Sequence, residues 1–155
     1  MESRLYDELR QTKPFESREA EAMIQILRTA AWLTLRMEQY LKQYELTSAQ
    51  YNVLRILRGA GELGRSCQEI GERMVTLDSD ITRLLDRLEK RGWLKRHRDT
   101  EDRRVIRVKI TAAGRKVLEE LDAPQKEWTR KHMGHLSEAR LKQLCLTLDE
   151  IRAVE

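Results

Sequence analysis

Residues 66–109 read SCQEIGERMVTLDSDITRLLDRLEKRGWLKRHRDTEDRRVIRVK, and this stretch decides the fold. Apolar residues recur at helical spacing first over a short segment that begins at Ser66, and then over a longer segment that ends at Gly92. After Gly92 the pattern becomes that of strands, with apolar and basic residues alternating over 106–110. Two helices followed by a basic hairpin are typical of a winged helix-turn-helix, which places its second helix in the major groove of DNA and its loop beside it.

The positive charge of the chain is concentrated in this hairpin. Residues 91–109 contain eight Lys or Arg and three acids, so their local excess of five positive charges exceeds the net charge of +4 of the whole chain. A net charge of +4 alone would not establish nucleic-acid binding. A local excess on one hairpin, however, predicts an element that contacts phosphates.

Composition excludes several classes of protein. Hydrophobic residues make up 40% and charged residues 36% of the 155 residues. No apolar run approaches the roughly 20 residues that a membrane span needs, and the polar first residues do not resemble a signal peptide. Two cysteines, Cys67 and Cys145, are too few for a disulfide framework and fit a reducing compartment. We therefore expect a cytoplasmic protein that does not interact with a membrane.

Helical segments flank the central stretch on both sides. Residues 17–44 carry apolar side chains over more than half of the helix circumference, which predicts contacts with their own domain and with a second subunit. A further helix is expected from Ala112, and Pro124 should kink or interrupt it. The last helix has a narrow leucine seam. We expect a mainly α fold with one β-hairpin, as a single domain over 1–155 that contains a winged helix-turn-helix region at 48–114 and dimerisation helices at 17–44 and 112–155.

Several polar residues stand where these helices should begin. Ser66 and Glu69 have the spacing of a capping box, in which each side chain accepts a hydrogen bond from the other residue's backbone N–H. Single hydroxyl or carboxylate side chains can cap the other helices by accepting from a backbone N–H. The predicted single caps are Ser48, Asp78, Thr111 and Ser137.

Three consecutive fragments resemble the MarR family of bacterial transcription regulators. ITRLLDRLEKRGWLKR (81–96) resembles the family's recognition helix and first wing strand. DTEDRR (99–104) resembles the wing tip with its Asp-x-Arg signature, at Asp102 and Arg104. VIRVKITAAG (105–114) resembles the second wing strand and the Thr-x-x-Gly that opens the next helix. The resemblance covers most of the chain, and only the N-terminal arm falls outside it.

This resemblance implies a function for the whole chain. It implies a homodimer in which the first and last helices of both subunits interlock, and binding of double-stranded palindromic operator DNA. Members of the family usually repress transcription and often respond to small aromatic or lipophilic ligands or to oxidants, so the resemblance implies a repressor that such an effector can regulate. In the family the effector pocket lies between the dimerisation helices and the winged domain, so Trp32, Arg36 and Tyr40 are candidate ligand-binding residues.

Within the wing, 95–109, Arg104 is the first candidate for DNA contact. An arginine is narrow and permanently charged, so it can enter an A·T-rich minor groove, where the potential is most negative. Asp102 could pair with Arg104 and hold its direction. The alternative is that Asp102 serves only turn geometry and that Arg104 is a solvated strand residue. The candidate contacts in the wing are Arg96, Arg98, Asp102, Arg103 and Arg104.

The predicted recognition helix, 78–91, is poor in positive charge. From Thr76 to Lys90 it has three basic and four acidic residues, so it should supply sequence specificity while the wing supplies most of the attraction. Arg83 could donate two hydrogen bonds to guanine. Asp80 could accept from cytosine or only stabilise the helix dipole, and Asp86 and Arg87 could form ion pairs within the domain. Candidate contacts outside the wing are Ser66, Gln68, Thr76, Ser79, Asp80, Thr82, Arg83 and Arg87.

Other chemistries have weaker support. Cys67 and Cys145 lie on or beside apolar stripes, which favours packing over oxidant sensing. His132 and His135 lack further metal ligands nearby in sequence, and no catalytic set or glycine-rich phosphate loop is present, so we expect neither a metal, a cofactor nor an enzyme. Two alternatives stay open: a winged-helix module for protein–protein interaction without specific DNA binding, and a regulator that responds to redox state or metal.

Overall fold

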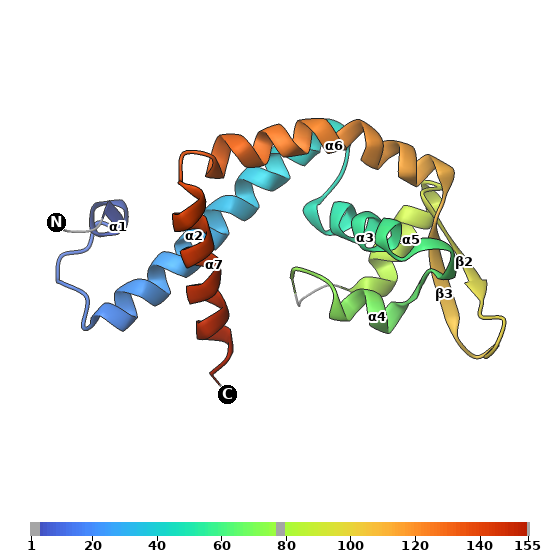
Figure 1. Cartoon of the computed structure of the whole chain (residues 1–155), viewed down its shortest axis with the longest axis horizontal. Coiled ribbons are helices and arrows are strands. Elements are labelled where there is room, and N and C mark those ends of the chain that lie inside the picture. Colours follow the sequence, from blue (N-terminus) through green and yellow to red (C-terminus); the bar gives the residue numbers. More distant parts are fainter. Residues whose placement is uncertain (1–3, 77–79, 155) are drawn as a thin grey trace.

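The computed structural model describes residues 4–76 and 80–154. Asp78, predicted as a helix cap, and Ser79, predicted as a DNA contact, lie outside the described residues. The chain is mainly helical with one small sheet, as the sequence predicts (Figure 1). The elements are α1 (Arg4–Glu8), α2 (Arg18–Leu41), η1 (Lys42–Tyr44), α3 (Ser48–Gly59), η2 (Gly61–Leu63), β1 (Arg65–Ser66), α4 (Cys67–Glu72), α5 (Ile81–Lys90), β2 (Leu94–Arg98), β3 (Ile106–Ile110), α6 (Ala112–Met133) and α7 (Glu138–Arg152).

The buried core lies in the winged unit formed by α3, α4, α5 and the sheet. Each helix presents its apolar face inward, and the first half of α6 closes the cluster. Burial of these side chains supplies the main driving force for folding this unit. The fully buried members include Leu54, Leu57, Ile70, Leu85, Leu88, Val108 and Leu118.

The predicted hairpin is present and gains a third strand. The antiparallel sheet has the order β1-β3-β2, and Arg96 of β2 lies opposite Val108 of β3. β1 is only two residues long, so it adds one edge to the wing beside α4. The backbone packs closely at Gly114, at the base of the wing, where a Cβ would lie 2.2 Å from the carbonyl oxygen of Trp93. Glycine fits this position because it has no Cβ.

Three of the predicted caps are confirmed. The Ser66–Glu69 capping box is present, and the hydroxyls of Thr111 and Ser137 accept from the backbone N–H three residues later. The prediction for Ser48 is wrong, because Thr47 caps α3 in a reciprocal box with Gln50.

The start of α5 also differs from the prediction. α5 begins at Ile81, three residues later than expected, and the carboxylate of Asp80 caps it by accepting from the N–H of Arg83.

Pro124 does not interrupt α6, which runs as one helix through it. Proline removes one backbone hydrogen bond, and this bends a helix without ending it when tertiary packing holds both halves. Leu121 is buried before the proline, and Trp128 packs on Tyr40 after it. α6 therefore arches from the wing, over α3, to the middle of α2, where His132 lies beside Trp32 (Figure 1).

The outer faces of α2 and α7 remain uncovered in the single chain. Met23 and Leu27 of α2 are each 63% exposed, and α7 has no buried residue. Cys145, expected to pack beside the seam of α7, is exposed. α7 and the N-terminal part of α2 lie apart from the winged unit, whereas the C-terminal end of α2 packs on it through Leu41 (Figure 1). Among the described residues, no helix is both long and apolar enough to cross a membrane.

Candidate nucleic-acid interface

The tip of the wing presents an arginine held by a neighbouring acid. The Nε and Nη2 groups of Arg104 donate to the two carboxylate oxygens of Asp102, both at 3.1 Å, and the backbone N–H of Arg104 donates to Asp102 Oδ1 at 3.0 Å. The Arg104 side chain is 91% exposed. The hydrogen bonds from Arg104 lower the pKa of Asp102 below its usual value. The predicted pairing is therefore present, and three N–H groups of the guanidinium are not used by Asp102.

The loop behind this tip is organised by Asp99. Its Oδ1 accepts from the backbone N–H of Glu101 at 2.8 Å and of Asp102 at 3.2 Å. Its Oδ2 accepts from Arg107 Nε, and these contacts, the one with Arg107 first, lower the pKa of Asp99 to about 2. Arg107 also donates to Glu69 of α4 at 3.2 Å. Arg107 was counted with the positive charge of the wing, but its guanidinium is already paired on two sides.

The exposed face of α5 carries the expected recognition residues. Leu84, Leu85 and Leu88 point into the core, so Thr82, Arg83 and Arg87 are left exposed. Asp80 caps the helix and also pairs with Arg83, with Nε and Oδ2 3.2 Å apart. The sequence left open whether Asp80 accepts from cytosine or only stabilises the helix dipole, and its position as the cap of α5 favours a role in the helix.

Arg96 was predicted to contact DNA, but it faces the protein. Its guanidinium pairs with Asp86 at 2.7 Å and with Glu89 at 2.5 Å, and its side chain is only 23% exposed. The backbone N–H of Arg96 donates to Glu89 as well, at 3.0 Å. Arg96 therefore ties β2 to α5, and Asp86 finds its partner in the wing rather than on its own helix. Two of the acids of α5, Asp86 and Glu89, thus form ion pairs on the side of the helix that faces the wing.

Four further candidate contacts lie near the start of α4 and on the wing. Ser66 is half-buried and occupied in its capping box, whereas Gln68 is exposed and donates to Glu72 at 3.0 Å. Arg98 and Arg103 are exposed on the wing.

An open hollow of about 400 Å³ lies between the start of α3 and α5, and several of the predicted DNA contacts line it. Two other lining residues, Thr47 and Ala49, were not singled out from the sequence. The hollow is lined by Thr47, Ala49, Thr76, Asp80, Arg83, Leu84 and Arg87.

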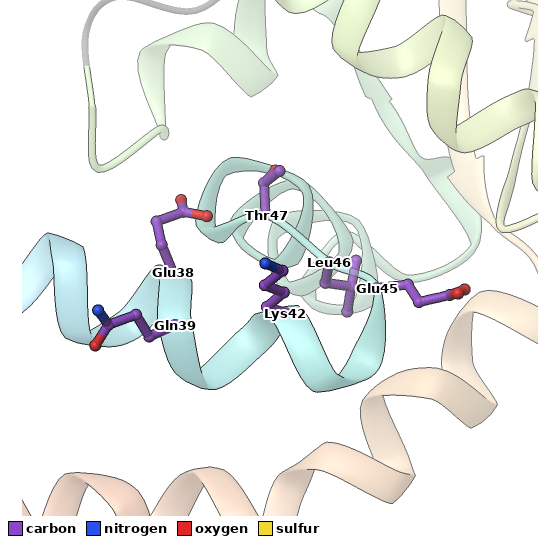
Figure 2. A pocket seen from close by; sticks show the side chains of 6 residues that line it. All are labelled: Glu38, Gln39, Lys42, Glu45, Leu46 and Thr47. Atoms are coloured by element: carbon purple, nitrogen blue, oxygen red, sulfur yellow. The ribbon is translucent and has the colours of Figure 1, made fainter.

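A second hollow, of about 380 Å³, lies at the bend between α2 and α3 (Figure 2). One lining residue, Glu38, accepts from the backbone N–H of Ser48 at 2.9 Å and from its hydroxyl. Another, Glu45, accepts through its carbonyl oxygen from Arg91, at the end of α5. The walls of this hollow therefore hold the winged unit against α2. Its lining residues are Glu38, Gln39, Lys42, Glu45, Leu46 and Thr47.

The candidate effector residues lie in an aromatic cluster between α2 and α6. The guanidinium of Arg36 lies 5.7 Å from the ring of Trp32, which lies 5.7 Å from His132. Tyr40 packs 5.8 Å from Trp128, and its hydroxyl is buried with no hydrogen-bond partner among the described residues. Burial raises the pKa of Tyr40 above its usual value. Sequence reasoning missed His132 as a neighbour of this cluster, because the contact joins residues about 100 positions apart.

The histidine and cysteine candidates for metal and redox chemistry lie within the part of the chain that the structure describes. No group of three or more His, Cys, Asp or Glu side chains there could hold a metal ion. His132 stacks on Trp128 at 4.0 Å, and its Nδ1 lies 2.8 Å from the Trp128 carbonyl oxygen. Both described cysteines are free thiols, Cys67 half-buried and Cys145 exposed.

Comparison with known proteins identifies the family. The MarR family model matches residues 46–106. The HTH-type transcriptional repressor MdtR of Bacillus subtilis (strain 168) is 35% identical over 107 residues, which cover 69% of this chain and 68% of the relative. The crystal structure of a MarR transcription factor from Planctomyces limnophilus is 38% identical, with a TM-score of 0.66 over 88% of this chain and 98% of that chain. The S. aureus MepR–DNA complex, 22% identical, shares the fold with a TM-score of 0.72 over 92% of this chain and 100% of that one. The chain belongs to the MarR family of helix-turn-helix transcriptional regulators.

Proposed function

We propose that two copies of this chain form a cytoplasmic homodimer that represses transcription by binding a palindromic operator. Residues 78–91 would lie in the major groove, and the wing, 95–109, would lie at the minor groove. The observation that carries this proposal is the wing tip, where Arg104 is 91% exposed and held in a bidentate pair by Asp102. An arginine that enters a DNA groove must be both exposed and held in one direction, and Asp102 holds Arg104 in this way. An arginine that only faces solvent would not need a paired carboxylate to fix its direction.

The chemistry of the tip suits a minor groove. A narrow A·T-rich groove concentrates negative potential, and a guanidinium inserted there replaces counterions without reading a base pattern in detail. Arg98 and Arg103 are exposed beside the tip and would neutralise flanking phosphates. Asp102 weakens the attraction of Arg104 for phosphate, but it limits the directions in which that side chain can point.

The exposed face of α5 suits sequence readout. Arg83 can offer two donors to a guanine, and Thr82 can contact a base or a phosphate. Thr76 and Arg87 line the hollow beside them and would contact the DNA backbone. Because few positive charges lie on this face, specificity rather than affinity would come from α5.

A second copy of the chain would cover the outer faces of α2 and α7. Contiguous apolar side chains on a helix face are costly in water, and a twofold axis would bury the same patch on both copies. The two winged units would then be held at a fixed spacing. Half-sites should lie about one helical turn of DNA apart, roughly 34 Å between centres.

An effector of small aromatic or lipophilic character would act at the cluster of Trp32, Arg36 and Tyr40. Its rings offer stacking surfaces, Arg36 offers a partner for an acidic group, and the hydroxyl of Tyr40 is buried without a hydrogen bond among the described residues. The cluster joins α2 to α6, which support the winged unit. Occupation of the cluster would therefore change the spacing of the two wings and release the operator.

Selection of bound fragments from genomic DNA tests this function. The recovered fragments should share a palindrome, and duplex affinity should fall at least about a hundredfold between 50 and 200 mM salt, as expected when several phosphates are neutralised. A protein-interaction module without specific DNA binding would instead recover no common sequence. Recovery of a single unrepeated site, together with a monomeric protein in solution, would contradict the homodimer.

A further inference from the structure

The loop that carries Arg104 is closed by its own hydrogen bonds. The backbone N–H of Asp99 donates to the carbonyl oxygen of Val105, and that of Val105 donates to the carbonyl oxygen of Asp102, each at 2.9 Å. The carboxylate of Asp99 accepts from the next turn of the same loop, at Glu101 and Asp102. One carboxylate therefore sets the path of the backbone from the end of β2 to the residue that holds Arg104.

Asp99 is itself fixed by Arg107. The Nε group of Arg107 donates to Asp99 Oδ2, and its Nη1 group donates to Glu69 at 3.2 Å. The side chain of Asp99 is 12% exposed and that of Arg107 is 30% exposed, so the pair is partly shielded from water. Arg107 is the second residue of β3, the central strand of the sheet, and lies opposite His97 of β2 and Ser66 of β1.

Glu69 connects the pair to the body of the winged unit. It accepts from the backbone N–H of Ser66 at 2.8 Å and from Arg65 at 3.1 Å, in addition to Arg107. The hydrogen bonds from Ser66 are the main reason that the pKa of Glu69 lies below its usual value. Glu69 lies in the first turn of α4, which packs into the core through Ile70. Glu69 therefore links the Asp99–Arg107 pair to the core of the winged unit.

We propose that Asp99 and Arg107 are positioning residues for DNA binding: the chain Glu69–Arg107–Asp99 holds the wing loop so that Asp102 presents Arg104 to the minor groove. This proposal rests on the proposed function of Arg104. A loop that is ordered before binding loses less conformational entropy on the DNA. The charge of Arg107 suggests a phosphate contact, but its guanidinium is already shared by the carboxylates of Asp99 and Glu69, which gives it a positioning role instead.

The sign of one charge change separates positioning from simple attraction. Asp99→Ala removes a negative charge close to the DNA, so electrostatic attraction alone predicts tighter binding. If Asp99 positions Arg104, the same substitution should weaken operator binding about tenfold, the effect of ordering one or two side chains and their loop. Glu101→Ala is the matched control, because it removes the same charge from the same loop. Within 4–76 and 80–154, Glu101 takes part in the hydrogen bonds of the loop through its backbone N–H, which alanine keeps.

The experiment measures the full-length protein with and without DNA. Fluorescence anisotropy gives the operator affinity of the wild type, Asp99→Ala, Glu101→Ala, Arg107→Gln and Arg104→Ala, and of the double variant that combines Asp99→Ala with Arg104→Ala. Asp99→Ala and Arg107→Gln should both weaken binding, and Glu101→Ala should not. In the Arg104→Ala background, Asp99→Ala should change the affinity by less than about twofold, because both substitutions remove the same contact. Equal affinities of Asp99→Ala and Glu101→Ala would overturn the proposal.

A second readout tests positioning without DNA. The ¹⁵N heteronuclear NOE at Asp102 and Arg104 in the free protein should fall in Asp99→Ala and in Arg107→Gln, and stay at the wild-type value in Glu101→Ala. Unchanged values in the first two variants would overturn the positioning role even if the affinity falls. If Arg104→Ala binds the operator like the wild type, the function proposed for Arg104 fails instead, while the NOE values still report whether Asp99 orders the loop.

Discussion

The tip and the base of the wing use the same residue type in opposite ways. At the tip, Arg104 pairs with a neighbour in its own loop and is 91% exposed. At the base, Arg96 pairs with Asp86 and Glu89 of α5 and is 23% exposed. Both arginines belong to one basic hairpin, so the count of charges does not distinguish them. The position of the partner acid does, because an acid on another element turns the arginine inward, and an acid within the loop leaves it facing solvent.

This difference changes the source of attraction for DNA. Of the eight basic residues in 91–109, Arg91, Arg96 and Arg107 each pair with an acid on another element. Arg98, Arg103 and Arg104 are therefore exposed at the outer part of the wing, and Lys95 is exposed near its base, where Arg96 joins β2 to α5.

The largest expected effect is at the tip. Arg104→Ala should weaken operator binding about 10- to 100-fold, the usual cost of losing a specific arginine contact. Its thermal unfolding midpoint should equal that of the wild type, because the side chain is 91% exposed and its partner, Asp102, belongs to the same loop. Anisotropy and thermal melts check both expectations. Arg130→Ala is the control, since it also removes an exposed, acid-paired arginine, on α6, and it should bind as the wild type does.

The next effect concerns specificity rather than the wing. Arg83→Ala should lose about tenfold in affinity for the operator and should discriminate less at one base pair of each half-site, because a bidentate arginine–guanine contact supplies roughly 1–3 kcal/mol of discrimination. Binding to a set of single-base operator variants measures this. A uniform loss over all variants would show that Arg83 contacts phosphate only.

A smaller effect is expected at the base. Arg96→Ala should lower the free energy of unfolding by about 1–2 kcal/mol, since it removes the guanidinium that pairs with Asp86 and Glu89, while the backbone N–H of residue 96 still donates to Glu89. Urea denaturation measures this loss, and Arg96→Lys should recover part of it. If Arg96→Ala unfolds like the wild type but loses DNA binding, Arg96 contacts DNA directly, and the contrast between base and tip is wrong.

The smallest effect is a titration. The folded-state pKa of Asp99 is about 2, below the roughly 3.9 of an unperturbed aspartate, so its ion pair stabilises the wing above about pH 4 and is lost as the pH falls toward 2. Carboxyl ¹³C shifts of Asp99 should show this midpoint, and Arg107→Gln should raise the pKa toward the ordinary value. An ordinary pKa in the wild type would show that the pair does not form in solution.

Much of the winged unit could be predicted because its signals are local. The capping box at Ser66 and Glu69 lies within four residues, and so does the Asp102–Arg104 pair. The α3 cap also had a local signal, because Thr47 and Gln50 fit a capping box better than Ser48 alone does.

The rest depended on contacts between distant residues. Arg107 meets Glu69 across 38 positions, and nothing in a count of charges shows which way its side chain turns. Pro124 stays within one helix because Leu121 and Trp128 are held by other elements. The aromatic cluster likewise joins α2 to α6, so only the fold brings Trp32 next to His132.

The most direct test of the wing tip changes the DNA and the protein together. The base pairs under each wing of the recovered operator are changed from A·T to G·C, and the affinities of the wild type and of Arg104→Ala for both duplexes are measured at one salt concentration. The wild type should bind the A·T duplex much more tightly than Arg104→Ala does, and this difference in affinity should mostly disappear on the G·C duplex, because the wider groove has a weaker negative potential. Arg104→Ala should bind both duplexes equally. An equal preference for the A·T duplex in both proteins would contradict the assignment of Arg104 to the minor groove.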